Sequence, residues 1–185
     1  MKRLFIAIKI KPDAEFMEQF RGLKDALSHE PVKREEEHNI NITLKFLGET
    51  GEERIPAIGE ALDKVAKSTK VFRFSLQGLG LFGSKYDPRV IWTAITPYES
   101  LVSLMQEVHT ALENAGFERD RQNLVPHLTL GRIKFLRDKK LFHETLAEFK
   151  GIASSPMTAG GMILFESILK KEGPEYRMIQ AHPFQ

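Results

Sequence analysis

Cysteine is absent from the 185 residues of this chain. Its absence excludes disulfide bonds, thiolate nucleophiles and cysteine-ligated zinc, and is typical of a reducing compartment. Long apolar runs are absent as well. The apolar stretch at residues 4–8 is too short for a signal-peptide core, and no segment approaches the roughly 20 apolar residues of a membrane span. We therefore expect a cytoplasmic protein that does not bind a membrane.

A strong charge of one sign is also missing, because the net charge is +2 at pH 7. No global basic field predicts nucleic-acid binding, so any contact with RNA must be local and small. The chain is long enough for one sizeable domain or for two small lobes that share a groove. We expect a monomer with no obligate protein partner.

Hydrophobic periodicity and capping residues predict alternating strands and helices. Asp13 is suited to cap the first helix, and Gly116 to end the third. Gly48 is expected to end the second strand, and the glycines at 78, 80 and 83 to mark bends. The expected strands are residues 4–10, 40–47, 71–76, 90–96, 128–133, 157–169 and 176–182. The expected helices are residues 13–27, 52–67, 101–115 and 139–149, and residues 28–38 are expected to form a polar loop.

Two segments of the chain share one plan of apolar strand, helix, polar loop and strand. The second strand reads NITLKF at residues 41–46 in the first segment and HLTLGR at residues 127–132 in the second. The same 38 positions separate Phe5 from Thr43 and Ile91 from Thr129. Alternation along a strand places His127 and Thr129 on one face. Either motif alone is explained by a half-buried strand, but the matched pair favours a shared functional site.

The two motifs together resemble those of the two-histidine (2H) phosphoesterases, and within them the RNA 2′,3′-cyclic phosphodiesterases, which are also called 2′-5′ RNA ligase-like. Two copies of His-x-Thr-x (HxTx) define that family. ITLKFLGE at residues 42–49 resembles the first motif, PHLTLGR at 126–132 the second, and RLFIAI at 3–8 the family's opening strand. The resemblance covers nearly the whole chain and is weakest after Lys139. It departs at Asn41, where the family has histidine.

The resemblance implies an α+β fold of two pseudo-symmetric lobes, each a mainly antiparallel sheet with outer helices, that face each other across a central groove. Residues 1–185 would form a single bilobal domain. The implied reaction is hydrolysis of an RNA-terminal 2′,3′-cyclic phosphate to a 2′-phosphomonoester, without a metal or other cofactor. The implied partners are RNA 3′ ends, short oligonucleotides or cyclic nucleotides.

The resemblance also assigns roles to individual residues. His127 takes a proton-transfer role, which we expect to be that of general base toward water, and Asn41 occupies the position of the family's first histidine. Thr43 and Thr129 are expected to bind phosphate oxygens. Arg132 and Lys45 are further candidate phosphate contacts. Lys45 is expected on the face of Thr43, whereas Arg132 reaches His127 only if Gly131 bends the strand.

Asn41 leaves the function open at this stage. An amide can donate a hydrogen bond but cannot transfer a proton near pH 7, and losing a general acid or base costs on the order of 10²–10⁴-fold in rate. The chain could be naturally degenerate, asparagine could have been introduced to trap a ligand, or another histidine, of which His38 is the nearest, could substitute. The rival functions are an RNA-end or nucleotide binder, a phosphodiesterase acting on 2′-5′ linked or other small phosphodiesters, and a plain α/β domain with an accidental resemblance.

Overall fold

The computed structural model describes residues 1–120 and 124–185. Its elements in chain order are β1 (Lys2–Lys9), α1 (Ala14–Ala26), β2 (Val32–Arg34), η1 (Glu37–Asn39), β3 (Asn41–Thr50), η2 (Glu52–Arg54), α2 (Ile55–Ser68), β4 (Phe72–Gly83), β5 (Pro88–Thr96), α3 (Glu99–Asn114), β6 (His127–Ile133), α4 (Lys139–Glu148), β7 (Met157–Ala159), β8 (Gly161–Lys170) and β9 (Gly173–Pro183).

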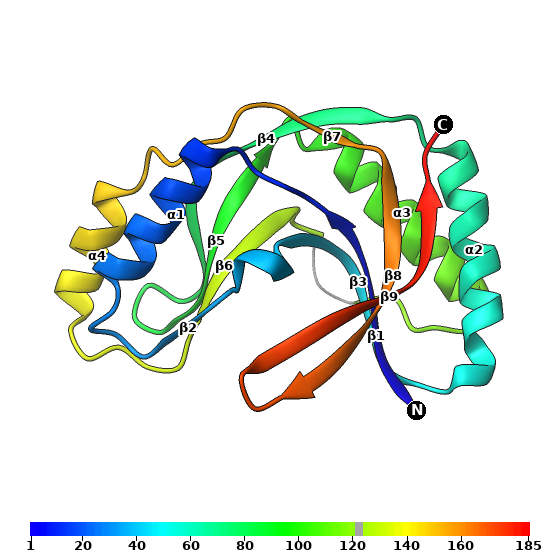
Figure 1. The fold of residues 1–185 in the computed structure, drawn as a ribbon, viewed down its shortest axis with the longest axis horizontal. Coiled ribbons are helices and arrows are strands. Elements are labelled where there is room, and N and C mark those ends of the chain that lie inside the picture. The colour runs from blue at the N-terminus through cyan, green and yellow to red at the C-terminus, as the bar shows by residue number, and fades with distance from the viewer. Residues whose placement is uncertain (121–123) are drawn as a thin grey trace.

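The strands form two antiparallel sheets, with the orders β3-β1-β8-β9 and β2-β6-β5-β4-β7. Helices α2 and α3 lie outside the four-stranded sheet, and α1 and α4 lie outside the five-stranded sheet (Figure 1). The expected α+β fold of two mainly antiparallel sheets with outer helices is confirmed. Within the described residues, no helix is long and apolar enough to span a membrane.

The two halves exchange helices. Helix α1 follows β1 of the four-stranded sheet but lies beside α4 on the other half, and α3 follows β5 of the five-stranded sheet but contacts β3 (Figure 1). Asp13 caps α1 by accepting a hydrogen bond from the Phe16 N–H at 2.8 Å, as the sequence predicts. One cluster of buried apolar side chains draws on both sheets, which holds the motif strands β3 and β6 in a fixed relation.

The boundaries differ from the expectation mainly at glycines. Strand β3 continues past Gly48 to Thr50, because Gly48 takes a positive φ of 68° and still pairs with Leu4. Strand β4 likewise runs through the glycines that were expected to be bends. Gly80 is needed there because a Cβ would lie 2.2 Å from the Trp92 ring of β5. The single strand expected at 157–169 is divided at Gly160 into β7 and β8, which belong to different sheets.

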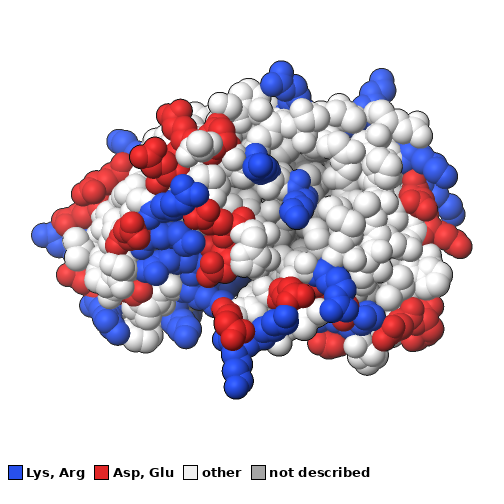
Figure 2. All heavy atoms as spheres, in the orientation of Figure 1, with Lys and Arg blue, Asp and Glu red and all other residues white. Residues whose placement is uncertain are grey.

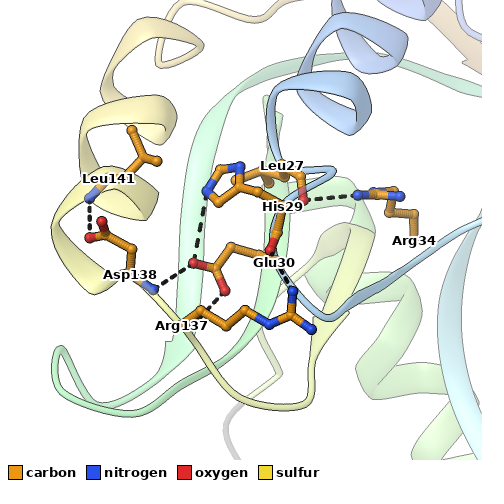
Figure 3. A network of polar contacts seen from close by, with 7 residues as sticks. All are labelled: Leu27, His29, Glu30, Arg34, Arg137, Asp138 and Leu141. Atoms are coloured by element: carbon orange, nitrogen blue, oxygen red, sulfur yellow. Dashed lines mark hydrogen bonds and ion pairs between the residues drawn. The ribbon is translucent and has the colours of Figure 1, made fainter.

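The expected loop at 28–38 contains the short strand β2 and the 3-10 helix η1. Buried Glu30 fixes the start of this segment, because its carboxylate accepts hydrogen bonds from the backbone N–H groups of Arg137 and Asp138 at 2.7 and 2.8 Å (Figure 3). Asp138 in turn caps α4 by accepting from the Leu141 N–H. These bonds join the segment after α1 to the segment after β6, so that β2 lies against β6.

Acidic and basic side chains intermingle over the left part and the lower edge of the face seen in Figure 2, whereas its centre is largely uncharged. Lysine and arginine are densest over the half that carries α1 and β2. Arg21, Lys24, Lys33 and Arg34 line a cavity there together with the acidic residues 35–37. Asp25 and Glu172 line the same cavity, so its charge is mixed, in keeping with the small net charge of +2 of the whole chain.

Candidate active site

The two motif strands converge on a small cavity of about 40 Å³ between the sheets. Asn41 and Thr43 line it from β3, and His127, Thr129 and Arg132 line it from β6. Five of the six predicted site residues therefore lie together, although about 86 positions separate the motifs. An accidental resemblance would leave these side chains scattered, so their convergence contradicts that rival.

The same backbone irregularity follows the threonine of each motif. The register between β1 and β3 skips Leu44, and the register between β5 and β6 skips Leu130. A bulge of this kind turns every later side chain of the strand to the opposite face. In β6 it brings Arg132 onto the face of Thr129, as their cross-strand partners Val90 and Trp92 show. The predicted bend exists, but it lies at Leu130 rather than at Gly131.

The bulge in β3 removes Lys45 from the groove face. Lys45 pairs with Ile6, whereas Thr43 pairs with Ala7, so the two side chains lie on opposite faces of the sheet. The Lys45 side chain is 2% exposed, and its Nζ lies 2.9 Å from Asp120 Oδ1. The prediction that Lys45 shares the strand face of Thr43 is therefore wrong, because strict alternation does not hold across a bulge. Lys45 and Thr43 still line one of the larger cavities beside the small one, so a phosphate contact by Lys45 stays a prediction. Phe46 takes the groove position instead.

One hydrogen bond fixes the orientation of the His127 ring. Its Nδ1 lies 2.7 Å from the Val125 carbonyl oxygen, so Nδ1–H donates, and in the neutral imidazole Nε2 then carries the lone pair. The ring packs edge-on against Phe82, with centroids 4.7 Å apart. Burial lowers the pKa of His127 below its ordinary value, although the hydrogen bond to Val125 opposes the shift. Such an imidazole is suited to accept a proton from water.

Asn41 repeats half of this arrangement. Its Nδ2 donates to the Asn39 carbonyl oxygen at 2.7 Å, two residues earlier in the chain, as His127 donates to Val125. Its Oδ1 accepts from the Thr43 hydroxyl at 3.3 Å. An asparagine side chain ends at these atoms and has none that corresponds to imidazole Nε2. The first motif therefore keeps the orienting hydrogen bond of a histidine and lacks its proton-transfer atom.

Arg132 is placed to bind an anion. Its side chain is 54% exposed, and its Nε lies 3.7 Å from Glu35 Oε1, which is too far for a hydrogen bond. The guanidinium donors therefore remain available to phosphate oxygens, whose geometry they match. Arg132 also lines both of the larger cavities that flank the small one, so a ligand in either cavity lies close to it.

The two flanking cavities differ in character. One, of about 560 Å³, is lined by apolar side chains that include Phe82, Val90, Met105 and Leu124. The other, of about 520 Å³, is lined by Arg3, Lys33 and Tyr176 among others. A phosphate-sized centre between two larger cavities can hold a phosphodiester with a nucleoside on each side.

Comparison with known proteins agrees with this geometry. A family model for LigT-like phosphoesterases matches residues 8–92 and 95–176. The chain belongs to the LigT-like phosphoesterase family. It is 35% identical over 184 residues to the RNA 2′,3′-cyclic phosphodiesterase of Methanocaldococcus jannaschii, covering 96% of this chain and 98% of that protein. It is 33% identical over 176 residues to the protein of the same name from Archaeoglobus fulgidus, covering 95% and 96%.

Solved structures share the LigT-like fold. A protein from Thermus thermophilus superposes with a TM-score of 0.75 at 24% identity, covering 98% of this chain and 97% of that one. Escherichia coli LigT in complex with 3′-AMP also gives a TM-score of 0.75, at 20% identity, covering 99% and 98%.

Sequence reasoning missed several residues of this LigT-like site. Glu35, Asn39, Phe46 and Tyr176 line the small cavity. Glu35 belongs to a run of acidic residues that is typical of a solvent-exposed loop. Tyr176 reaches the groove from β9, far from either motif in the sequence. No sequence signal identifies either residue. His38, the histidine nearest to the missing one, is exposed on η1 and does not line this cavity.

Proposed function

We propose that this chain hydrolyses RNA-terminal 2′,3′-cyclic phosphate to a 2′-phosphomonoester without a metal ion. The observation that carries the proposal is the convergence of His127 with two threonines and Arg132 around a phosphate-sized cavity. The names of the M. jannaschii and A. fulgidus relatives support the same activity. We further propose that the whole chain acts as one bilobal monomeric unit in the cytoplasm, on RNA 3′ ends, short oligonucleotides or cyclic nucleotides.

The proposed chemistry assigns one task to each group. His127 Nε2 takes a proton from water while the water oxygen attacks phosphorus in line with the departing O3′. Thr43, Thr129 and Arg132 hold the non-bridging oxygens, where negative charge is greatest. The bond from phosphorus to O3′ breaks, the phosphate stays on O2′, and O3′ must gain a proton.

Asn41 weakens the last step. In the position of an imidazole, it can donate a hydrogen bond but cannot deliver a proton. The expected cost is about 10²–10⁴-fold in kcat, or about 3–6 kcal/mol of barrier. Binding is affected less, since a phosphate contact from the amide survives.

The test is a substrate panel. We expect the purified chain to convert a dinucleotide ending in 2′,3′-cyclic phosphate to the 2′-phosphate, measured by chromatography of the products. Cleavage of a 2′-5′ linked dimer with no action on the cyclic end would replace the proposed reaction by another phosphodiester hydrolysis.

A second candidate function follows from Asn41, which keeps the orienting bond of a histidine without its chemistry. The chain would then bind an RNA end or nucleotide and not turn it over. Tight binding of the cyclic dinucleotide with no product at long times, in both wild type and Asn41→His, would favour this binder over the enzyme.

A further inference from the structure

The cavity around Asn41 contains other groups that can carry a proton. Apart from His127 and Arg132, the ionisable side chains among the described residues that line it are Glu35 and Tyr176. Arginine does not release its proton at physiological pH. A substitute for the missing proton donor must therefore be sought in Glu35 or Tyr176.

The backbone places Glu35 on the groove face. Its N–H donates to the Leu130 carbonyl oxygen at 3.1 Å, which continues the ladder between β2 and β6. In that ladder Lys33 lies opposite Arg132. Glu35 is two residues after Lys33 and so points to the same side as Arg132. The buried carboxylate of Glu30 anchors the start of the segment. The position of Glu35 is therefore fixed both by this anchor and by its own backbone bond to β6.

Burial of Glu35 makes ionisation of its carboxyl less favourable than it is in water. Its side chain is only 21% exposed, and burial raises the pKa of the carboxyl above its ordinary value, although Arg132 and Lys33 oppose the shift. A bound phosphodiester strengthens the effect, because it adds negative charge nearby and engages Arg132. Tyr176 suits the role less well, since burial raises the pKa of a phenol that is already a weak acid.

We propose that Glu35 is a catalytic residue that donates the proton to the leaving O3′ in place of the absent imidazole. The assignment rests on the proposed hydrolase function. In the step, His127 accepts a proton from water as the new bond from oxygen to phosphorus forms. The bond from phosphorus to O3′ breaks, and the Glu35 carboxyl proton passes to O3′. Exchange with solvent then returns the carboxyl and the imidazole to their starting forms.

The pH dependence of this step reflects the charged and titratable groups that share a cavity with Glu35. They are Arg132 and His127 from β6, Tyr176 from β9, Arg3 from β1, Arg21, Lys24 and Asp25 from α1, Glu172 between β8 and β9, and Lys33, Arg34, Glu36 and Glu37 on the segment around it. Because Glu35 must be protonated, kcat/KM of the wild type is expected to decline as pH rises through the raised pKa of the Glu35 carboxyl. In Asn41→His an imidazolium can supply the proton, so the decline should move to higher pH.

The experiment compares wild type, Glu35→Gln, Asn41→His and the double variant on the cyclic dinucleotide. Glutamine keeps the size of the side chain and removes its proton. We expect Glu35→Gln to lower kcat of the wild type by at least 100-fold, and this loss to shrink at least tenfold when Asn41→His is present. A residue that only positions Arg132 would cause the same loss in both backgrounds, and that result would overturn the proposal. Activity of the double variant reports that the substituted protein folds.

The remaining outcomes also decide the matter. Tyr176→Phe is the matched control, and a loss as large as that of Glu35→Gln would overturn the assignment to Glu35. If the decline of kcat/KM at alkaline pH is the same in Glu35→Gln as in the wild type, the assignment to Glu35 is overturned as well. If Asn41→His is active while wild type is not, Glu35 donates no proton and only this inference fails. If Asn41→His is inactive as well, the proposed hydrolase function itself fails.

Discussion

Strands β3 and β6 share a backbone and differ in chemistry. In each, the first motif side chain donates a hydrogen bond to the carbonyl two residues earlier, and a bulge follows the threonine. In β6 that side chain is the imidazole of His127, and in β3 it is the amide of Asn41. The orientation of the first side chain thus depends on local backbone that both strands retain. Proton transfer depends on a ring atom that only β6 supplies.

The strands differ again beyond the bulge. The groove position that Arg132 takes in β6 is taken by Phe46 in β3. Strand β6 therefore contributes both an imidazole and a cation, whereas β3 contributes a neutral amide and an aromatic face. The two strands hold an asymmetric site, and β6 carries most of the groups to which we assign a catalytic role.

The largest effect is expected from removing the chemistry of β6. His127→Asn in the Asn41→His background places asparagine and histidine in exchanged positions. We expect kcat/KM for the cyclic dinucleotide to fall by about 10²–10⁴-fold, because the general base is lost. Calorimetric affinity for a 2′-nucleotide should change much less. A swapped variant as active as Asn41→His would show that the strands are chemically interchangeable.

A smaller effect concerns pH. Because the pKa of His127 is lowered, the imidazole stays neutral at pH values somewhat below the ordinary histidine pKa of about 6.5. It becomes protonated, and loses its role as base, only as pH falls through the lower folded-state pKa. Folding stability that depends on neutral His127 is lost over the same range. NMR titration of the ring should give this pKa.

Phe82→Ala provides the control for the pH prediction. The substitution exposes the His127 ring and should raise its pKa toward the ordinary value. The acid limb of kcat/KM should move to higher pH with it. A midpoint for His127 above 6.5 in the wild type would contradict burial as the dominant cause.

The smallest effect separates the two threonines. Thr43 already donates to Asn41, whereas no corresponding bond joins Thr129 to His127 among the described residues, since Nδ1 is engaged with Val125. Thr129→Val should therefore cost about 1–2 kcal/mol of 2′-nucleotide affinity, and Thr43→Val less. Calorimetry on the two variants measures both. Equal losses would indicate that the hydroxyls contribute alike.

Much of the fold was predictable because its local signals are strong. Apolar alternation identified the motif strands, and Asp13 marked the start of α1, since such signals depend on neighbours in the sequence. The strand through residues 78–83 was not predicted. Gly80 serves close packing against Trp92, a contact between strands that the local sequence does not reveal.

The site was predictable only where alternation or family resemblance applied. The motif positions converge as the resemblance implies, but Lys45 was misplaced because a bulge in β3 depends on pairing with β1. Glu35 reaches the groove through a backbone bond to β6 and an anchor at Glu30. Both contacts join segments about 100 residues apart, and no local pattern encodes them.

The central claim is that the groove is an intact two-strand phosphoesterase site in which β3 lacks one proton-transfer atom. The most direct test is kcat for hydrolysis of a dinucleotide 2′,3′-cyclic phosphate by wild type and by Asn41→His, measured side by side. We predict that Asn41→His is faster by about 10²-fold, the lower end of the cost of losing a general acid or base, because Glu35 replaces part of the lost proton donation. An Asn41→His variant no faster than wild type would contradict the claim, because a restored imidazole in an intact site donates a proton more effectively than the Glu35 carboxyl.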